Sequence, residues 1–445
     1  MPDPSPVADL EQTEVGSYFV ANYPPFSVWT PEAVAADAIP ALESAPAVPA
    51  VPLGLYLHIP FCRKRCHFCY FRVYTDKNAR DVDQYLAWLG REWELYADRP
   101  ALAGRPFNFV YFGGGTPSFL STRQLETLVG RVTASRTWGT AEEITFECEP
   151  GTITGAKLSA IRQIGVTRLS LGVENFDDRI LEINGRAHRS PEIERVYREA
   201  RDLQFPQINI DLIAGMLGET DANWAACVER TVALDPDSVT IYQMELPYNT
   251  TISKDLLQHG GQFADPVASW ATKRRWVQEA FEALERAGYT IGSAYTAVKD
   301  PSKARFLYRD RLWQGADMIG LGVASFGHVN GVHLQNVDTW EKYSAAIERG
   351  ELPLGRAYRP TNEERMIREF ILQLKRGSVK PAAFASKYRV DLLDRFRDAL
   401  SRLQAGGYLA AADKDRIALT REGLLRVDVL LRNFFLPQHA GIRYT

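Results

Sequence analysis

The stretch LGLYLHIPFCRKRCHFC, residues 53–69, joins a short apolar run to a loop with three of the chain's five cysteines. Cys62, Cys66 and Cys69 follow the spacing C-x-x-x-C-x-x-C. Three thiolates on one tight loop can each ligate one iron of a cubane cluster, and the fourth iron then has no cysteine. The stretch therefore predicts a strand over 53–59, followed by a loop that binds a 4Fe–4S cluster with one open iron.

Two alternatives to a cluster are a zinc site and three thiols with no common ligand. A structural zinc site needs four ligands and usually has paired C-x-x-C units. His67 could be the fourth ligand, but it lies between two of the cysteines, where the loop geometry is awkward. Arg63, Lys64 and Arg65 raise the local positive potential and so favour thiolates. The cluster is the favoured interpretation.

Outward from this loop, short apolar runs alternate with segments of helical periodicity. Strands are expected at 53–59, 107–112, 143–148, 167–173, 208–213, 238–244 and 290–294, and helices at 81–96, 122–132, 190–203, 222–233 and 270–287. Strands that alternate with helices of this length are typical of βαβ units and a parallel sheet. The expected fold class is α/β, with a partial parallel (β/α)6 barrel at its centre.

The rest of the chain is expected to flank this barrel. Four segments are expected: an N-terminal arm and linker at 1–52, the barrel at 53–300, a barrel extension at 301–355 and a C-terminal helical, winged-helix-like domain at 356–445. The aromatic residues at 17–29 should dock onto the body of the protein. The Ala- and Pro-rich residues 35–52 should form an extended linker. Residues 300–345 are expected to be irregular, and a two-strand wing is expected near 416–419.

Composition places the chain among ordinary globular proteins. Of the 445 residues, 45% are hydrophobic and 24% are charged, which is a usual balance for a chain with a sizeable core. The net charge of −3 gives no indication of a basic face for nucleic acid. The sequence has no apolar stretch long enough for a membrane span and no secretory signal pattern, so a cytoplasmic protein is expected.

Five motifs in the barrel region resemble those of a known family. They are YLHIPFC at 56–62, YFGGGTP at 111–117, ECEP at 147–150, LSLGVE at 169–174 and NIDLI at 209–213. Their order and spacing resemble the radical SAM superfamily and, within it, the HemN-like family of oxygen-independent coproporphyrinogen III oxidases. The resemblance implies a 4Fe–4S cluster whose open iron chelates S-adenosylmethionine (SAM). It also implies reductive cleavage of SAM to a 5′-deoxyadenosyl radical, with a flavodoxin- or ferredoxin-type electron donor.

The resemblance further implies which residues contact the cofactors. The cluster would be held by Cys62, Cys66 and Cys69. One or two SAM molecules would be bound by Tyr56, Phe68, Gly114, Gly115, Thr116, Glu147, Glu174, Arg186, Asp211, Glu245 and Phe326. Tyr295 and Glu245 are the catalytic candidates. Their chemistry is suitable, because glycines let a ligand approach the backbone and an arginine fork matches a carboxylate.

Three positions depart from the family pattern. Glu174 stands where the family usually has Gln, Phe71 where the oxidases have a further cysteine, and Tyr295 where they have the histidine of an Asp-His pair. These differences weaken a literal coproporphyrinogen assignment. They favour a different small-molecule or lipid-like substrate on the same radical platform, with no nucleic acid as partner.

The reaction favoured on this basis is C-methylation or cyclopropanation with two SAM molecules. One alternative is coproporphyrinogen III oxidase-like decarboxylation or other tetrapyrrole chemistry. The other is a heme chaperone. The aromatic segment NYPPFSVW at 22–29 counts against the chaperone, because the resemblance implies that such proteins generally lack an arm of this kind before the barrel.

Overall fold

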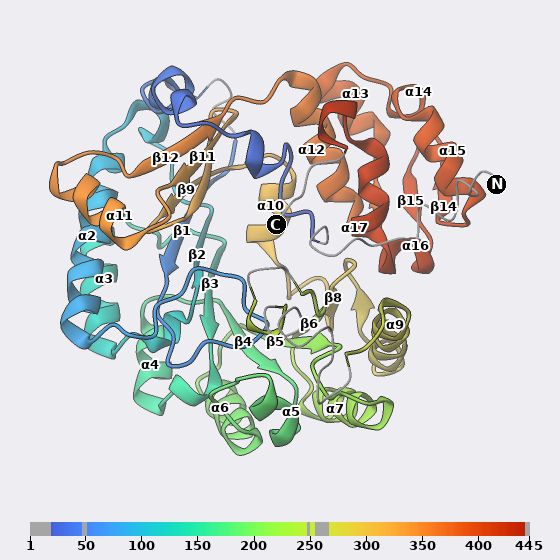
Figure 1. Ribbon diagram of the computed structural model, residues 1–445, viewed down its shortest axis with the longest axis horizontal. Helices are drawn as coiled ribbons and strands as arrows, with labels where there is room; N and C mark the ends of the chain where they lie inside the picture. The colour runs from blue at the N-terminus through green and yellow to red at the C-terminus, as the bar shows by residue number, and fades with distance from the viewer. Residues whose placement is uncertain (1–18, 47–50, 247–249, 254–266, 441–445) are drawn as a thin grey trace.

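The computed structural model describes residues 19–46, 51–246, 250–253 and 267–440. Within these residues the central feature is a 12-stranded sheet with strand order β12-β11-β10-β9-β1-β2-β3-β4-β5-β6-β8-β7. Figure 1 shows the sheet curving around the middle of the molecule, with helices on its outer side and the C-terminal helices at the upper right.

Six consecutive strands form the parallel half-barrel that the sequence predicts. They are β1 (Leu53–Ile59), β2 (Phe109–Gly114), β3 (Glu143–Cys148), β4 (Arg168–Glu174), β5 (Gln207–Ala214) and β6 (Ser238–Gln243). Each strand pairs in parallel with the next one. β1 is apolar almost throughout, and six of its seven residues are buried. In β3, β4 and β5, apolar residues alternate with polar ones, because successive side chains point to opposite faces of the sheet.

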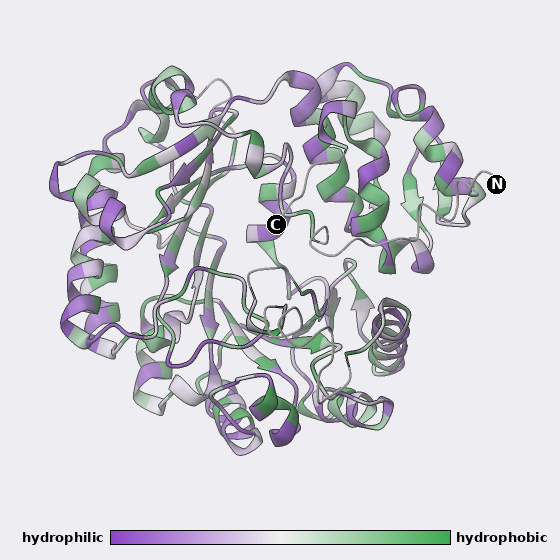
Figure 2. Cartoon of the chain, in the orientation of Figure 1, coloured by the Kyte–Doolittle hydropathy of each residue, from purple (hydrophilic) through white to green (hydrophobic). Residues whose placement is uncertain are grey.

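Helices connect these strands and cover the outer face of the sheet. They are α2 (Ala79–Ala97), α3 (Thr122–Ser135), α4 (Gly155–Gln163), α5 (Asp178–Ile183), α6 (Ser190–Asp202), α7 (Asp221–Leu234) and α9 (Trp270–Arg286). In α2, Leu89 and Trp93 are buried in the core, while Figure 2 shows hydrophilic residues along the outer side of the helix. No helix in the described part of the chain is long and apolar enough to cross a membrane.

The expectation of an irregular segment at 300–345 is wrong, because this segment extends the sheet. After α10 (Leu307–Trp313), β9 (Asp317–Leu321) pairs in parallel with the free edge of β1. Three antiparallel strands follow, with α11 (Trp340–Glu348) before the last: β10 (Phe326–Val329), β11 (Val332–Asn336) and β12 (Leu354–Tyr358). Such short strands, interrupted by glycine, lack the long periodic pattern that makes a strand visible in sequence.

The other edge of the sheet also differs from expectation. The single strand expected at 290–294 is two short strands, β7 (Thr290–Ile291) and β8 (Thr296–Val298). They pair antiparallel with each other, and β8 pairs antiparallel with β6. Tyr295 therefore lies in the turn between β7 and β8, and not within a strand.

The Ala- and Pro-rich segment is packed and helical, which corrects the expectation of an extended linker. Val34–Ala38 and α1 (Ile39–Leu42) form two short helical turns, the first against β11 and β12 and the second against residues Pro100–Leu102. Ala38, Ala41 and Leu42 are buried in the main core. Alanine has the highest helix propensity and a small side chain, so this composition suits a close-packed helix as well as a linker. The remainder of the expected linker, at 47–50, lies outside the described residues.

The aromatic arm docks as predicted, from Phe19 onward, and its first residues, 17 and 18, lie outside the described part. Tyr23 is fully buried, and its hydroxyl accepts a hydrogen bond from the backbone N–H of Leu436 at 3.0 Å. Trp29 stacks on the ring of His333 in β11, with 5.0 Å between ring centroids. The arm thus lies between the sheet extension and the C-terminal domain.

The C-terminal domain has its own apolar core, built around Phe370, Phe396 and Phe434. Its elements are α12 (Asn362–Leu374), β13 (Ser378–Val379), α13 (Pro381–Tyr388), α14 (Leu392–Arg395), α15 (Arg397–Ala405), β14 (Leu409–Ala412), β15 (Ile417–Leu419), α16 (Arg421–Leu425) and α17 (Val427–Leu430). Strands β14 and β15 pair antiparallel and form the expected wing.

Candidate active site

A cavity of about 1110 Å³ is lined by the parallel strands, the arm and the C-terminal domain. All the residues predicted from sequence to form the site line this one cavity, although they come from positions 56 to 326 of the chain. They are Tyr56, Cys62, Cys66, Phe68, Cys69, Gly114, Gly115, Thr116, Glu147, Glu174, Arg186, Asp211, Glu245, Tyr295 and Phe326. The structure therefore brings the predicted residues together, and the contacts below show what each can do.

The cysteine loop, residues 60–70, leaves the C-terminal end of β1. The backbone N–H of Cys62 donates to the carbonyl of Tyr74 at 3.1 Å, and the N–H of Cys69 donates to the carbonyl of Cys66 at 3.1 Å. All three thiols are half-buried. In the free protein, burial raises the pKa of the Cys62 thiol to about 12 and also raises that of Cys69. Bound iron would reverse this effect, because a metal ion deprotonates the thiol that ligates it.

The donor set of this loop fits a 4Fe–4S cluster better than a single zinc ion. His67, the fourth ligand of the zinc alternative, does not line the cavity, and its Nδ1 lies 2.9 Å from the carbonyl of Ile183. Among the described residues, no three His, Cys, Asp or Glu side chains converge as ligands of one metal ion. A cubane cluster needs three thiolates spread around a larger volume, with one iron left open.

The glycine motif at the end of β2 lies directly beside the cysteine loop. Gly114 has φ +116°, a conformation that other residues rarely adopt. A Cβ atom on Gly115 would lie 2.9 Å from the carbonyl carbon of Pro60, so only glycine fits. The hydroxyl of Thr116 lies 3.2 Å from the Sγ of Cys62. Backbone groups of the motif are therefore open to a ligand next to the cluster loop.

Three buried carboxyl groups lie on adjacent strands: Glu147 on β3, Glu174 at the end of β4 and Asp211 on β5. The hydroxyl of Tyr111 donates to Glu147 Oε1 at 2.5 Å, and that of Ser170 donates to Asp211 Oδ2 at 2.8 Å. Burial raises the pKa of Glu147 and of Glu174 to about 7, and it raises the pKa of Asp211. A bound cation or sugar hydroxyl would compensate for the burial of these groups.

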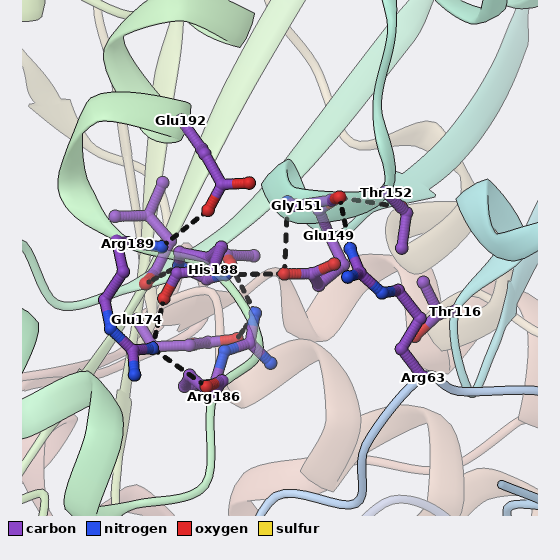
Figure 3. A network of polar contacts seen from close by, with 12 residues as sticks. Arg63, Thr116, Glu149, Gly151, Thr152, Glu174, Arg186, His188, Arg189 and Glu192 are labelled. Atoms are coloured by element: carbon purple, nitrogen blue, oxygen red, sulfur yellow. Dashed lines mark hydrogen bonds and ion pairs between the residues drawn. The ribbon is translucent and has the colours of Figure 1, made fainter.

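Arg186 lies between Glu174 and the cysteine loop, and Figure 3 shows its side chain close to Glu174. Its Nη1 lies 3.3 Å from the Sγ of Cys66, its Nη2 donates to the carbonyl of Gly172 at 2.5 Å, and the same nitrogen lies 3.7 Å from Glu174 Oε1. The guanidinium is thus held by three partners at the cluster end of the cavity, where it can also bind a carboxylate.

Sequence reasoning missed the pair of Glu149 and His188 that supports this region (Figure 3). His188 Nδ1 lies 2.8 Å from Glu149 Oε1, and its Nε2 lies 3.2 Å from the carbonyl of Val173. Glu149 also accepts the backbone N–H of Gly151 at 3.1 Å. Glu149 belongs to the ECEP motif, so its position was visible in the sequence, but its partner was not.

Tyr295 and Glu245, the two catalytic candidates, lie at the side of the cavity near the C-terminal domain. The hydroxyl of Tyr295 donates to Asp428 Oδ2, and burial raises the pKa of Tyr295 well above its ordinary value. Burial also raises the pKa of Glu245 to about 8. Glu245 is therefore mostly protonated at neutral pH and can donate a hydrogen bond to a ligand, whereas the hydroxyl proton of Tyr295 is already donated to Asp428.

The carboxylate of Asp428 also fastens the arm, and nothing in the sequence pointed to it. Its Oδ1 accepts the backbone N–H of Val20 at 2.9 Å and lies 2.6 Å from Lys375 Nζ. Lys375 donates to the carbonyl of Val20 at 2.8 Å and lies 3.8 Å from the centre of the Phe19 ring. The arm, the barrel turn with Tyr295 and the C-terminal domain therefore meet at one ion pair on the cavity wall.

The three aromatic residues that were predicted to contact SAM lie in different parts of the cavity wall. Tyr56 on β1 stacks with Tyr111 on β2, at a centroid distance of 5.9 Å. Phe68 packs beside the apolar side chains of Ile213 and Met244. Phe326 at the start of β10 packs against Phe26 of the arm, at 4.5 Å.

Comparisons with known proteins agree with this fold and site. The Radical SAM superfamily model matches residues 56–230, and the HemN C-terminal domain model matches residues 361–426. The structure of coproporphyrinogen III oxidase (HemN) from Escherichia coli superposes with a TM-score of 0.81, at 24% identity, and the match covers 94% of this chain and 96% of that chain. This structural match shows the fold.

Two curated relatives match most of the chain. The heme chaperone HemW of Bacillus subtilis (strain 168) is 28% identical over 373 residues, which are 83% of this chain and 96% of that protein. The oxygen-independent coproporphyrinogen III oxidase of Pseudomonas aeruginosa is 28% identical over 405 residues, which are 87% of this chain and 86% of that protein.

A parallel half-barrel with three cysteines after β1 and buried carboxyl groups on β3 to β5 defines a radical SAM protein. The chain belongs to the radical SAM superfamily, and within it to the HemN- and HemW-like proteins with a HemN C-terminal domain. This membership implies a 4Fe–4S cluster and SAM as cofactors.

Proposed function

We propose that this chain is an enzyme that cleaves SAM reductively and oxidises a carboxylate-bearing tetrapyrrole, in the manner of the coproporphyrinogen III oxidases that it resembles. The observation that carries the proposal is that the cysteine loop, the SAM-type residues and a large aromatic cavity form one continuous space. When bound, the cluster and SAM supply hydrogen-atom abstraction from the substrate. The residues of the chain bind and orient the reactants.

The proposed SAM site uses the groups at the cluster end of the cavity. Arg186, which is buried, would hold the carboxylate of SAM, and Glu147 in its ionised form would hold the ammonium group, because each is of opposite charge to its partner. Asp211 would accept hydrogen bonds from the ribose hydroxyls of SAM. Glu174 lies 3.7 Å from Arg186, so it can accept a further hydroxyl or hold the guanidinium in place. Backbone groups of Gly114 and Gly115 would flank the methionine part.

The proposed substrate class follows from the rest of the cavity. Its wall is rich in aromatic side chains, among them Phe26, Tyr111, Tyr242, Phe306, Tyr308 and Phe326, which suit a large flat molecule. Cationic side chains on the same wall suit carboxylate substituents: Arg168, Arg356 and Arg368. The relatives that match most of the chain are oxidases and a heme chaperone. They support tetrapyrrole chemistry over the methyl transfer that the sequence departures favoured.

The electron donor is proposed to be a flavodoxin- or ferredoxin-type protein that docks at the cysteine loop. Arg63, Lys64 and Arg65 are exposed on this loop, in a chain whose net charge is −3. Such a basic rim suits an acidic partner, and its contribution should weaken as salt concentration rises.

A heme chaperone is the second candidate, because HemW matches this chain over 96% of its own length. The arm is the structural observation against it. Phe19 and Phe26 of the arm line the cavity, and the family resemblance implies that heme chaperones generally lack an arm of this kind. Phe19 and Phe26 would enclose a substrate during turnover.

The experiment is an anaerobic incubation of the reconstituted protein with SAM, a reductant and coproporphyrinogen III. We expect 5′-deoxyadenosine together with a tetrapyrrole that has lost carbon dioxide, both detected by mass spectrometry. Formation of S-adenosylhomocysteine with a methylated product would instead establish methyl transfer. Stoichiometric heme binding with no 5′-deoxyadenosine would establish the chaperone and refute the enzyme.

A further inference from the structure

Arg168 is buried, and its guanidinium group has no hydrogen-bond partner in the described part of the protein. The residue is 1% exposed, yet it lines the cavity. Its Nε and Nη1 are enclosed without an acceptor. Its Nη2 is not enclosed in this way, so a ligand in the cavity can reach it. Buried guanidinium groups are normally paired, and this one requires an explanation.

The position of Arg168 follows from the alternation of β4. Successive side chains of a strand point to opposite faces, so Arg168, Ser170, Gly172 and Glu174 share the face that lines the cavity. Glu174 is at the cluster end and Ser170 contacts Asp211. Arg168 is six residues before Glu174, or about 20 Å deeper along the strand. It therefore lies beyond the groups proposed to bind SAM, on the floor of the cavity.

The nearby carboxyl groups do not satisfy Arg168, because each has other partners. Glu143 accepts the backbone N–H groups of Leu307 and Tyr308, at 2.7 and 3.0 Å. Asp211 accepts Ser170 and the side-chain amide of Asn209. These acids can balance the charge of Arg168 from a distance, but none of them accepts its N–H groups.

The ring of Phe306 holds the guanidinium in place without using its donors. The centre of the guanidinium lies 4.1 Å from the ring centroid, which is a close cation–π contact. The neighbouring Arg309 differs, because it donates to Ser293, Thr296 and Asp310. Arg168 is thus a positioned cation whose Nη2 remains open to a ligand in the cavity.

We propose that Arg168 binds a carboxylate of the substrate on the floor of the cavity. This inference rests on the proposed function for the substrate class, and it assigns the residue that recognises the acid group. The carboxylate would lie beside Phe306 and accept hydrogen bonds from Arg168. The carboxylate of SAM is the other source of this chemistry, and the experiment distinguishes the two.

The test is an equilibrium titration of the full-length, SAM-loaded protein with coproporphyrin III and with its methyl ester. The natural protein should bind the acid about tenfold to a hundredfold more tightly than the ester, as expected for a charge-assisted hydrogen bond. Arg168→Gln should reduce acid binding to the level of the ester and leave the affinity for SAM unchanged. The matched control, Arg309→Gln, should keep the preference for the acid, because the donors of Arg309 are already engaged.

Three results would overturn the inference: an Arg168→Gln protein that still prefers the acid, an equal loss in Arg309→Gln, or a loss confined to SAM binding. If Arg168→Gln does not fold, Arg168→Lys decides, because lysine keeps the charge but loses the planar fork. A smaller acid preference in Arg168→Lys supports the inference, and an unchanged one refutes it. The titration needs no turnover, so failure of the proposed oxidation would be recognised separately.

Discussion

Two buried arginines at opposite ends of one cavity differ in what the chain provides for them. Arg186, at the cluster end, contacts the Sγ of Cys66, the carbonyl of Gly172 and the carboxyl group of Glu174. Arg168, on the floor, stacks on Phe306 and has no hydrogen-bond partner in the described residues. At the cluster end, groups of the protein itself contact the guanidinium of Arg186. On the floor, an aromatic ring positions the guanidinium of Arg168, but no hydrogen-bond acceptor is provided for it.

This difference indicates how one scaffold can serve several substrates. Partners within the chain fix the groups that face the cluster, so these groups can keep the same geometry whatever lies deeper in the cavity. On the floor, the ring of Phe306 holds the guanidinium of Arg168 in place, and a ligand can accept its open N–H group. The two ends should therefore respond differently to mutation. Substitutions at the cluster end should weaken cofactor binding, and substitutions on the floor should weaken substrate binding.

The largest effect should come from Cys69→Ala at the cluster end. Removal of one of three thiolates leaves two irons without a protein ligand, so we expect loss of the cluster and complete loss of SAM cleavage. Binding of coproporphyrin III on the floor should persist. Iron analysis, electron paramagnetic resonance and porphyrin titration measure these outcomes.

Cys227→Ala is the matched control, because Cys227 is a buried residue of α7 and does not line the cavity. This variant should keep its iron and its SAM cleavage. A Cys69→Ala protein that retained a full cluster would show that the three-cysteine assignment is wrong.

The next largest effect should come from Arg186→Gln. This change removes the cation between Cys66 and Glu174, and the affinity for SAM should fall by about a hundredfold, at the upper end of the range for charged hydrogen bonds. Porphyrin affinity should change little. Equilibrium dialysis with SAM measures the effect, and Arg186→Lys should recover only part of it, because the ammonium group cannot contact two partners as a planar fork does. Equal losses of SAM and porphyrin affinity would remove the distinction between the two ends.

Most of the fold was predictable because its parallel strands are long and buried. β1 is an almost continuous apolar run, and in β3, β4 and β5 apolar residues recur at every second position, which is a pattern that the sequence shows directly. The short strands β7 to β12 were not predictable, because two to five residues do not establish a period. The Ala- and Pro-rich segment misled for another reason: its composition suits both a linker and a close-packed helix, and only the neighbouring β11 and β12 decide between them.

The site was predictable where it is built from residues close together in sequence. The cysteine spacing and the glycine motif indicate their own chemistry, and Glu147 and Asp211 stand out as acids in apolar strands. Asp428 and Lys375 could not be found in this way, because their function depends on contact with Val20 of the arm, more than 350 positions away. Arg168 was visible at the start of β4, but its lack of a partner is a property of the folded structure alone.

A smaller effect should come from the titration of Glu147, which should make both the stability of the protein and its affinity for SAM depend on pH. Burial raises this pKa to about 7, whereas the unfolded chain has the ordinary value near 4.5. The carboxyl group therefore contributes stability at low pH that is lost as pH rises through about 7. SAM affinity should change in the opposite direction, because the charged carboxylate that forms above about 7 attracts the ammonium group. The expected gain in SAM affinity is about tenfold.

Thermal unfolding without SAM and dialysis with SAM, both as functions of pH, measure these two trends. Glu147→Gln should flatten both of them, because the amide does not titrate. A Glu147→Gln protein that kept the full pH dependence of SAM binding would assign it to another group, such as Glu174. Porphyrin affinity at the floor should not follow this titration.

The smallest effect should come from Phe26→Ala in the arm, which lies between the two ends. Phe26 packs against Phe326 at 4.5 Å and against Trp29 at 5.0 Å. Loss of these aromatic contacts should lower the free energy of unfolding by about 0.5–1.5 kcal/mol beyond the buried area. The KM for the tetrapyrrole should rise a few-fold while SAM affinity stays the same, since the arm lines the substrate space but contacts none of the proposed SAM ligands except Phe326. A change in SAM affinity without a change in KM would place Phe326 and the arm at the cluster end, and the division of the cavity would have to be redrawn.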